Sequence, residues 1–80
     1  SNKALEVANS SLSDGGNVQQ WSYTGANNQQ WKIEATTDGF YKLTNRNSGK
    51  VLDVSANATT DGQNVHQWTY LNGTNQQWKL

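Results

Sequence analysis

The sequence contains no cysteine and no methionine among its 80 residues. Without cysteine there is no disulfide framework, no thiolate nucleophile and no cysteine-based metal site. Charged residues make up only 15% of the chain, and its six basic and six acidic side chains cancel. This balance argues against nucleic acid or an anionic membrane as a partner, because both need a basic surface. No apolar run approaches the ~20 residues of a membrane-spanning helix, and the first residues lack the pattern of a signal peptide.

Large apolar residues are also scarce, since Leu, Ile, Val and Phe together number 13 of the 80 residues. A share this low is common in disordered chains, but those usually carry a high net charge and few aromatics. Here the net charge is zero and there are four Trp and three Tyr. Composition alone therefore leaves two alternatives, a β domain rich in hydrogen bonds or a Gln/Asn-rich low-complexity chain.

An internal repeat decides between these alternatives. Residues 1–33 align with residues 48–80 at a constant offset of 47 without gaps, and 16 of the 33 pairs are identical. The identical pairs include both members of a tryptophan pair spaced ten residues apart, which random drift in a low-complexity chain would not preserve. The chain is therefore expected to be a folded repeat protein.

Within one repeat, the residue pattern predicts four short strands. Turn signals of the Asp-Gly type precede or separate apolar and alternating segments, as in β-hairpins. The expected strands are residues 40–43, 51–54, 64–70 and 77–80. No segment shows helical spacing over ten residues, so the fold class is all-β.

Four strands per unit suit a propeller blade or one lobe of a trefoil, and 80 residues cannot supply the at least four blades of a propeller. The order Leu-Asp-Val, Asp-Gly, Val-x-Gln-Trp, Asn-Gln-Gln-Trp resembles the ricin-type lectin repeat with its Q-x-W signature. The two signatures are Gln29-Gln30-Trp31 and Gln76-Gln77-Trp78. The resemblance implies a β-trefoil of three lobes, of which this chain holds about 1.7. The first lobe is expected over residues 1–34, without its first strand, and the second over residues 35–80; missing chain or oligomerisation would complete the trefoil.

The resemblance also implies one candidate sugar pocket per lobe. In the second repeat it falls on Asp53, His66, Trp68, Asn75 and Gln76. In the first repeat it falls on Glu6, Gln19, Trp21, Asn28 and Gln29. Two residues depart from the family pattern: Glu6 is one methylene longer than the usual Asp, and His66 replaces the usual Gln and adds pH sensitivity.

The chemistry of these residue types agrees with a neutral polyol. A carboxylate accepts hydrogen bonds from sugar hydroxyls, an amide both donates and accepts, and an indole covers the C–H face of the ring. Other roles stay open, because Gln29 and Gln76 could instead satisfy buried backbone groups. Trp31 and Trp78 are expected to pack in the core, as are Tyr23 and Tyr70.

Catalysis and metal binding are not expected. The chain has one histidine and no acidic cluster with calcium- or zinc-site spacing, so neither a metal nor another cofactor is expected. Glu6 and Asp53 occupy equivalent places in different repeats, too far apart by pseudo-symmetry to act on one glycosidic bond.

The expected function is a non-catalytic, lectin-like module that binds carbohydrate such as galactan or xylan; the alternative is a structural or protein-interaction trefoil with decayed pockets. The family resemblance further implies a secreted, extracellular protein and a partner glycoside hydrolase domain in the same chain.

Overall fold

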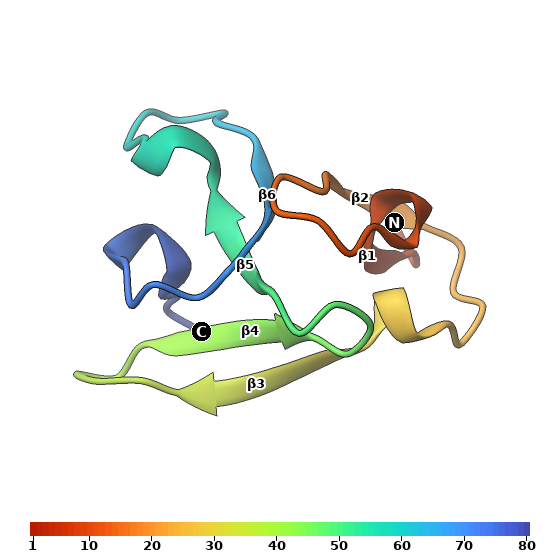
Figure 1. Cartoon of the computed structure of the whole chain (residues 1–80), viewed down its shortest axis with the longest axis horizontal. Helices are drawn as coiled ribbons and strands as arrows, with labels where there is room; N and C mark the ends of the chain where they lie inside the picture. Colours follow the sequence, from red (N-terminus) through yellow and green to blue (C-terminus); the bar gives the residue numbers. More distant parts are fainter.

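The computed structural model describes all of residues 1–80 and contains only short strands and single 3₁₀ turns (Figure 1). The strands are β1 (Ala4–Val7), β2 (Val18–Trp21), β3 (Trp31–Ala35), β4 (Tyr41–Asn45), β5 (Val51–Val54) and β6 (Val65–Trp68). The 3₁₀ turns are η1 (Ala8–Ser10), η2 (Asn27–Gln29), η3 (Ser55–Asn57) and η4 (Thr74–Gln76). No helix has the length and apolarity that crossing a membrane requires. The all-β expectation is confirmed.

The strands form two antiparallel sheets, one with the order β1-β2 and one with the order β3-β4-β5-β6. The β1-β2 pair and the β5-β6 pair have the same register, with Leu5 opposite Gln20 and Leu52 opposite Gln67. The β3-β4 hairpin joins the two repeats, and the expected boundary after residue 34 falls at its β3 strand (Figure 1).

The predicted strands differ from the observed ones mainly at their ends. The prediction for 51–54 matches β5, while 40–43 becomes Tyr41–Asn45 and 64–70 shortens to Val65–Trp68. The predicted strand at 77–80 is wrong, because only Trp78 pairs, in a single bridge with Tyr41. Its equivalent in the first repeat, β3, does form a strand, since β4 pairs along its whole length. Strand formation here depends on a neighbouring strand and not on the local sequence alone.

The Asp-Gly turn signals all mark turns in the structure. Gly15, Gly39 and Gly62 have φ values of 89°, 80° and 82°. This left-handed backbone strongly favours glycine, because a β-carbon would clash with the backbone.

The hydrophobic core is small and polar groups complete it. Val7, Val18 and Leu52 form the buried cluster, and the half-buried Trp31 and Trp78 pack against it as expected. Each indole Nε1 donates to a backbone carbonyl, Trp31 to Leu5 at 2.9 Å and Trp78 to Leu52 at 3.0 Å.

Tyrosine does not extend this core. Tyr23 is 66% exposed, so its prediction as a core residue is wrong; Tyr70 is half-buried, with its ring 4.5 Å from Lys42 Nζ. Of the 11 buried residues, seven are polar or charged, and no buried side-chain nitrogen or oxygen lacks a hydrogen bond. Hydrogen bonding therefore replaces much of the apolar packing that this composition cannot supply.

The turn at residues 11–16 of the first repeat docks on β6 of the second. Gln67, 0% exposed, donates from Nε2 to the carbonyls of Ser11 and Ser13 at 2.9 and 2.8 Å. The backbone adds Gly15 N to Gln67 O at 2.8 Å and Gln67 N to Gly16 O at 2.9 Å. A β-carbon at Gly16 would lie 2.8 Å from Gln67 Nε2, so this close approach needs glycine.

Candidate functional site

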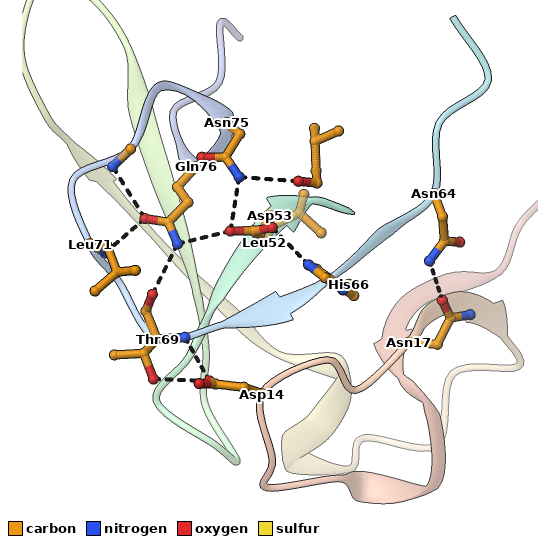
Figure 2. A network of polar contacts seen from close by, with 12 residues as sticks. Asp14, Asn17, Leu52, Asp53, Asn64, His66, Thr69, Leu71, Asn75 and Gln76 are labelled. Atoms are coloured by element: carbon orange, nitrogen blue, oxygen red, sulfur yellow. Dashed lines mark hydrogen bonds and ion pairs between the residues drawn. The ribbon is translucent and has the colours of Figure 1, made fainter. Parts of the chain in front are cut away.

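Asp53 is the centre of a polar network in the second repeat (Figure 2). Its side chain, on β5, is 4% exposed and bonds three other predicted site residues. His66 Nε2 on β6 lies 2.7 Å from Asp53 Oδ1. From η4, Gln76 Nε2 donates to Asp53 Oδ2 at 2.9 Å and Asn75 Nδ2 at 3.2 Å. Three segments distant in sequence therefore converge on one carboxylate.

The amide of Gln76 has no hydrogen-bonding capacity left. Besides Asp53, its Nε2 donates to the carbonyl of Thr69 at 2.9 Å. Its Oε1 accepts from the backbone N–H groups of Leu71 at 2.8 Å and Gly73 at 3.4 Å. A side-chain amide offers two donors and two acceptor sites, and all four are used here. Gln76 thus holds the loop 69–73 in place and orients Asp53.

Asn75 and His66, in contrast, each keep an atom that forms no hydrogen bond within the protein. Both Nδ2 hydrogens of Asn75 are used, on Asp53 and on the carbonyl of Val54 at 3.1 Å, but its Oδ1 accepts no bond within the protein. The 2.7 Å contact with the Asp53 carboxylate places a proton on His66 Nε2, so the Nδ1 of a neutral imidazole is an acceptor. Asp53 itself accepts three bonds out of about four that a carboxylate can take.

A hollow of about 360 Å³ lies over this network. It is lined by Asp53, Ala56, Asn57, His66, Trp68, Leu71, Gly73, Asn75 and Gln76. All five residues predicted in the second repeat are therefore brought together.

Four lining residues were not predicted: Ala56, Asn57, Leu71 and Gly73. Ala56 and Asn57 form a wall from η3 with left-handed φ values of 58° and 53°, a backbone conformation that no sequence signal announces at alanine. Leu71 is 70% exposed at the rim, where an apolar residue in a polar loop is the signal that could have found it.

Trp68 forms the aromatic side of the hollow. Its side chain lies on the same face of β6 as His66, and the two rings stack with centroids 5.4 Å apart and an interplanar angle of 29°. Trp68 is 37% exposed, and its stacking on His66 fixes the orientation of the ring. The indole is therefore both accessible and held in place.

Asp14 of the first repeat braces the end of β6 through hydrogen bonds with Thr69 (Figure 2) and an ion pair with Lys50. Asp14 Oδ1 accepts from Thr69 N at 2.8 Å and from Thr69 Oγ1 at 2.9 Å, and Lys50 Nζ lies 2.9 Å away. The hydrogen bond from Lys50, followed by those from Thr69, lowers the pKa of Asp14 below its ordinary value. The first repeat therefore fixes the residue that follows Trp68.

In the first repeat the equivalent carboxylate is enclosed by glutamine. Glu6 is 7% exposed; its Oε2 accepts from Gln19 Nε2 and its Oε1 from Gln29 Nε2, both at 2.9 Å. Asn28 bonds the carbonyl of Val7 at 2.9 Å and does not meet Glu6. Gln29 is saturated like Gln76, because it also donates to Ser22 O and accepts from Thr24.

Trp21 does not join this group to form a hollow. It is 55% exposed and lines a separate depression with Lys3, Gln20 and Ser22, none of them predicted. A further depression of about 550 Å³ involves Trp31, Lys32 and Arg46 and holds no predicted residue. The two repeats thus share residue types but differ in the pocket they form.

Comparison with known proteins places the chain in a family. The model of the ricin-type β-trefoil lectin domain-like family matches residues 1–68 and, separately, residues 37–80. The chain belongs to this family. A search of proteins with curated descriptions finds no sequence match.

Several solved structures share the fold of this ricin-type chain. The designed 3-fold symmetric protein ThreeFoil superposes with a TM-score of 0.95 at 56% identity, over 98% of this chain and 56% of that one. An exo-β-1,3-galactanase from Clostridium thermocellum has a TM-score of 0.93 at 44% identity, over 98% of this chain and 17% of that one. A mosquitocidal holotoxin has a TM-score of 0.78 at 29% identity, over 95% of this chain and 10% of that one.

The chain thus spans just over half of ThreeFoil and a small part of the two natural proteins. Its fold is a partial β-trefoil of the ricin type, which is a carbohydrate-binding fold.

Proposed function

We propose that this chain is a non-catalytic carbohydrate-binding module that holds a neutral sugar in the hollow of the second repeat. The observation that carries the proposal is the convergence of Trp68, Asp53 and Asn75 on one open hollow. Trp68 offers an exposed indole to the C–H face of a sugar ring. Galactan and xylan are the polysaccharides we propose as ligands, and the galactanase neighbour supports galactan.

The unused hydrogen-bond acceptors of the hollow suit the hydroxyl donors of a polyol. Asp53, Asn75 Oδ1 and Nδ1 of a neutral His66 are all acceptors. Sugar hydroxyls can donate to each of them, and the bond to the Asp53 carboxylate is charge-assisted. Gln76 contributes by position rather than by contact, since its amide is saturated.

We propose that the equivalent residues of the first repeat do not bind sugar as one site. Glu6, Gln19 and Gln29 bond one another, and Trp21 and Asn28 lie outside this group. Binding at a single shallow hollow is weak, on the order of 1 mM. Fusion to a polysaccharide-degrading domain would make such weak binding useful, since the tethered module raises the effective concentration of substrate. We propose this arrangement, and an extracellular location with it.

The remainder of the trefoil is proposed to come from further chain or from other copies of this chain. Leu5, Ile33 and Leu80 are 41%, 55% and 72% exposed, which supports a missing apolar neighbour. The molar mass in solution distinguishes the two: light scattering that gives one chain per particle contradicts self-association.

The test of the binding proposal is the affinity of the wild-type chain, Trp68→Ala and Trp21→Ala for β-1,3-galactan, xylan and galactose. We expect affinity electrophoresis to show retardation by at least one saccharide, lost in Trp68→Ala and retained in Trp21→Ala. Unchanged circular dichroism confirms that each variant is folded. Equal binding by wild type and Trp68→Ala would show that the hollow is not the site.

A structural or protein-interaction role is the second candidate. The enclosed Glu6 carboxylate favours it, because this network stabilises the repeat without offering a pocket. Absence of retardation by every saccharide would support this role over sugar binding.

A further inference from the structure

The two repeats differ at one position beside the central carboxylate. The second repeat has His66 bonded to Asp53, and the first has Gln19 bonded to Glu6. Glutamine keeps its donor at any pH, whereas an imidazole gains a proton in the range where histidine side chains titrate. The chain therefore contains both a titratable and a non-titratable version of the same hydrogen bond.

We propose that sugar binding in the second repeat weakens as the pH falls, through protonation of His66; this inference rests on the proposed function. His66 is in contact with both polar and aromatic parts of the hollow. Its Nε2 lies 2.7 Å from Asp53 Oδ1, and its ring stacks on Trp68 at 5.4 Å between centroids. A positive charge on this ring acts on both at once.

The effect on Asp53 comes from charge neutralisation. With a neutral imidazole, the carboxylate carries the only charge among the residues that line the hollow. Asp53 stays ionised, but an imidazolium at 2.7 Å offsets its charge and makes the electrostatic potential at the carboxylate less negative. A sugar hydroxyl that donates to Asp53 is then held less tightly.

Protonation of His66 also weakens the contacts that the imidazole and the indole of Trp68 would make with sugar. Protonation converts Nδ1 from an acceptor to a donor, so a sugar hydroxyl that donates to the neutral imidazole would lose that hydrogen bond. Nδ1 makes no bond within the protein and is not buried, so no internal group compensates. The imidazolium also draws on the π electrons of the stacked Trp68, for which the C–H groups of the sugar compete.

Asp53 is the only other titratable group among the residues that line the hollow. The first repeat also packs against His66, through the uncharged Asn17, which pairs with it in an isolated bridge. η3 contributes Ala56 and Asn57, η4 and its loop contribute Leu71, Gly73, Asn75 and Gln76, and β5 contributes only Asp53. The nearest further ion pair is that of Asp14 with Lys50, which contacts Thr69. Since the pKa of Asp14 is lowered, this pair stays charged in the range where imidazoles titrate.

The experiment compares the wild-type chain with His66→Gln, the residue that the first repeat has at this position. Affinity for the saccharide that retards the wild-type chain in the binding test is measured by calorimetry or NMR titration at about pH 5 and about pH 8, on either side of the usual histidine range. We expect the wild-type affinity to fall about three- to tenfold at the lower pH, and that of His66→Gln to stay constant.

The outcomes separate this inference from the proposed function. Wild-type binding that is equal at both pH values, or stronger at the lower one, overturns the inference and leaves the proposed function standing. The same pH dependence in His66→Gln overturns it as well, because the titrating group then lies elsewhere. Absence of saccharide binding by both proteins at both pH values overturns the proposed function, and the inference with it.

Discussion

Asn64 Nδ2 donates a 2.8 Å hydrogen bond to Asn17 Oδ1, although the two residues are equivalent positions of the two repeats, 47 residues apart (Figure 2). Residues related by a rotation can lie this close only near the rotation axis. The contact therefore marks the pseudo-symmetry axis of the trefoil. The two repeats contact each other around this axis. The turn at residues 11–16 of the first repeat docks on β6 of the second, and this is the only contact of its kind between the two repeats.

Gln67 and Gln20 test the energetic value of that contact. Gln67→Leu leaves the carbonyls of Ser11 and Ser13 without their donor in a site that is 0% exposed. We expect a loss of about 1–3 kcal/mol in the free energy of unfolding, measured by urea denaturation. Gln20→Leu is the matched control, because Gln20 is exposed; a change within about 0.5 kcal/mol is expected. Equal losses in the two variants would contradict the assignment of Gln67 as the clamp.

The contact between the turn of the first repeat and β6 should be sensitive to acid, because it includes the carboxylate of Asp14. Its pKa is lowered from 3.8 by Lys50 and Thr69, so the stabilisation is present above the ordinary value and is lost as the pH falls through the lowered one. We expect thermal melts of the wild type to lose stability below about pH 4, and Asp14→Asn to lose less over that interval. Asp61→Asn, at the equivalent turn, serves as control because the Asp61 side chain makes no hydrogen bond or ion pair. Identical acid profiles for wild type and Asp14→Asn would refute the prediction.

Leu52 and Leu5 are equivalent apolar positions with unequal burial. Leu52 is 7% exposed because β5 lies between β4 and β6, while Leu5 is 41% exposed because β1 pairs only with β2. We expect Leu52→Ala to lower the free energy of unfolding by about 2–5 kcal/mol, as for a core leucine. Leu5→Ala should cost well under half as much. A large effect at Leu5 would indicate that another chain covers it in solution, which the molar mass would then reveal.

Gln76 should affect sugar binding without touching sugar. Gln76→Leu removes four hydrogen bonds in a site that is 1% exposed, so the loop 69–73 loses its anchor and Asp53 one of its donors. We expect a loss of about 1–3 kcal/mol in stability and weaker saccharide binding. Gln76→Glu should rescue neither property, because a carboxylate oxygen would replace the Nε2 donor and face the Asp53 carboxylate. Full stability with binding abolished would instead place Gln76 in direct contact with the ligand.

Much of the candidate site could be predicted from the sequence, because its parts lie in short motifs whose local structure is strongly constrained. The Asp-Gly turns and the strand 51–54 appear where their residues indicate, and Asp53, His66, Trp68, Asn75 and Gln76 line one hollow. The strand at 77–80 could not be predicted correctly, because a strand needs a partner and Trp78 has only Tyr41. The wall formed by Ala56 and Asn57 was missed for a similar reason, since its left-handed backbone is imposed by the surrounding fold.

The sequence by itself determined the repeat, the all-β class and the residue types of both pockets, because these follow from local patterns that recur at a fixed interval. Only the tertiary structure decided which pocket is open. Trp68 stacks on His66 and lines the hollow over Asp53, whereas Trp21 lines a separate depression. The longer Glu6 side chain bonds Gln19 and Gln29 without meeting Asn28. The sequence shows that Glu6 is longer than Asp53, but only the three-dimensional arrangement shows which partners each carboxylate meets.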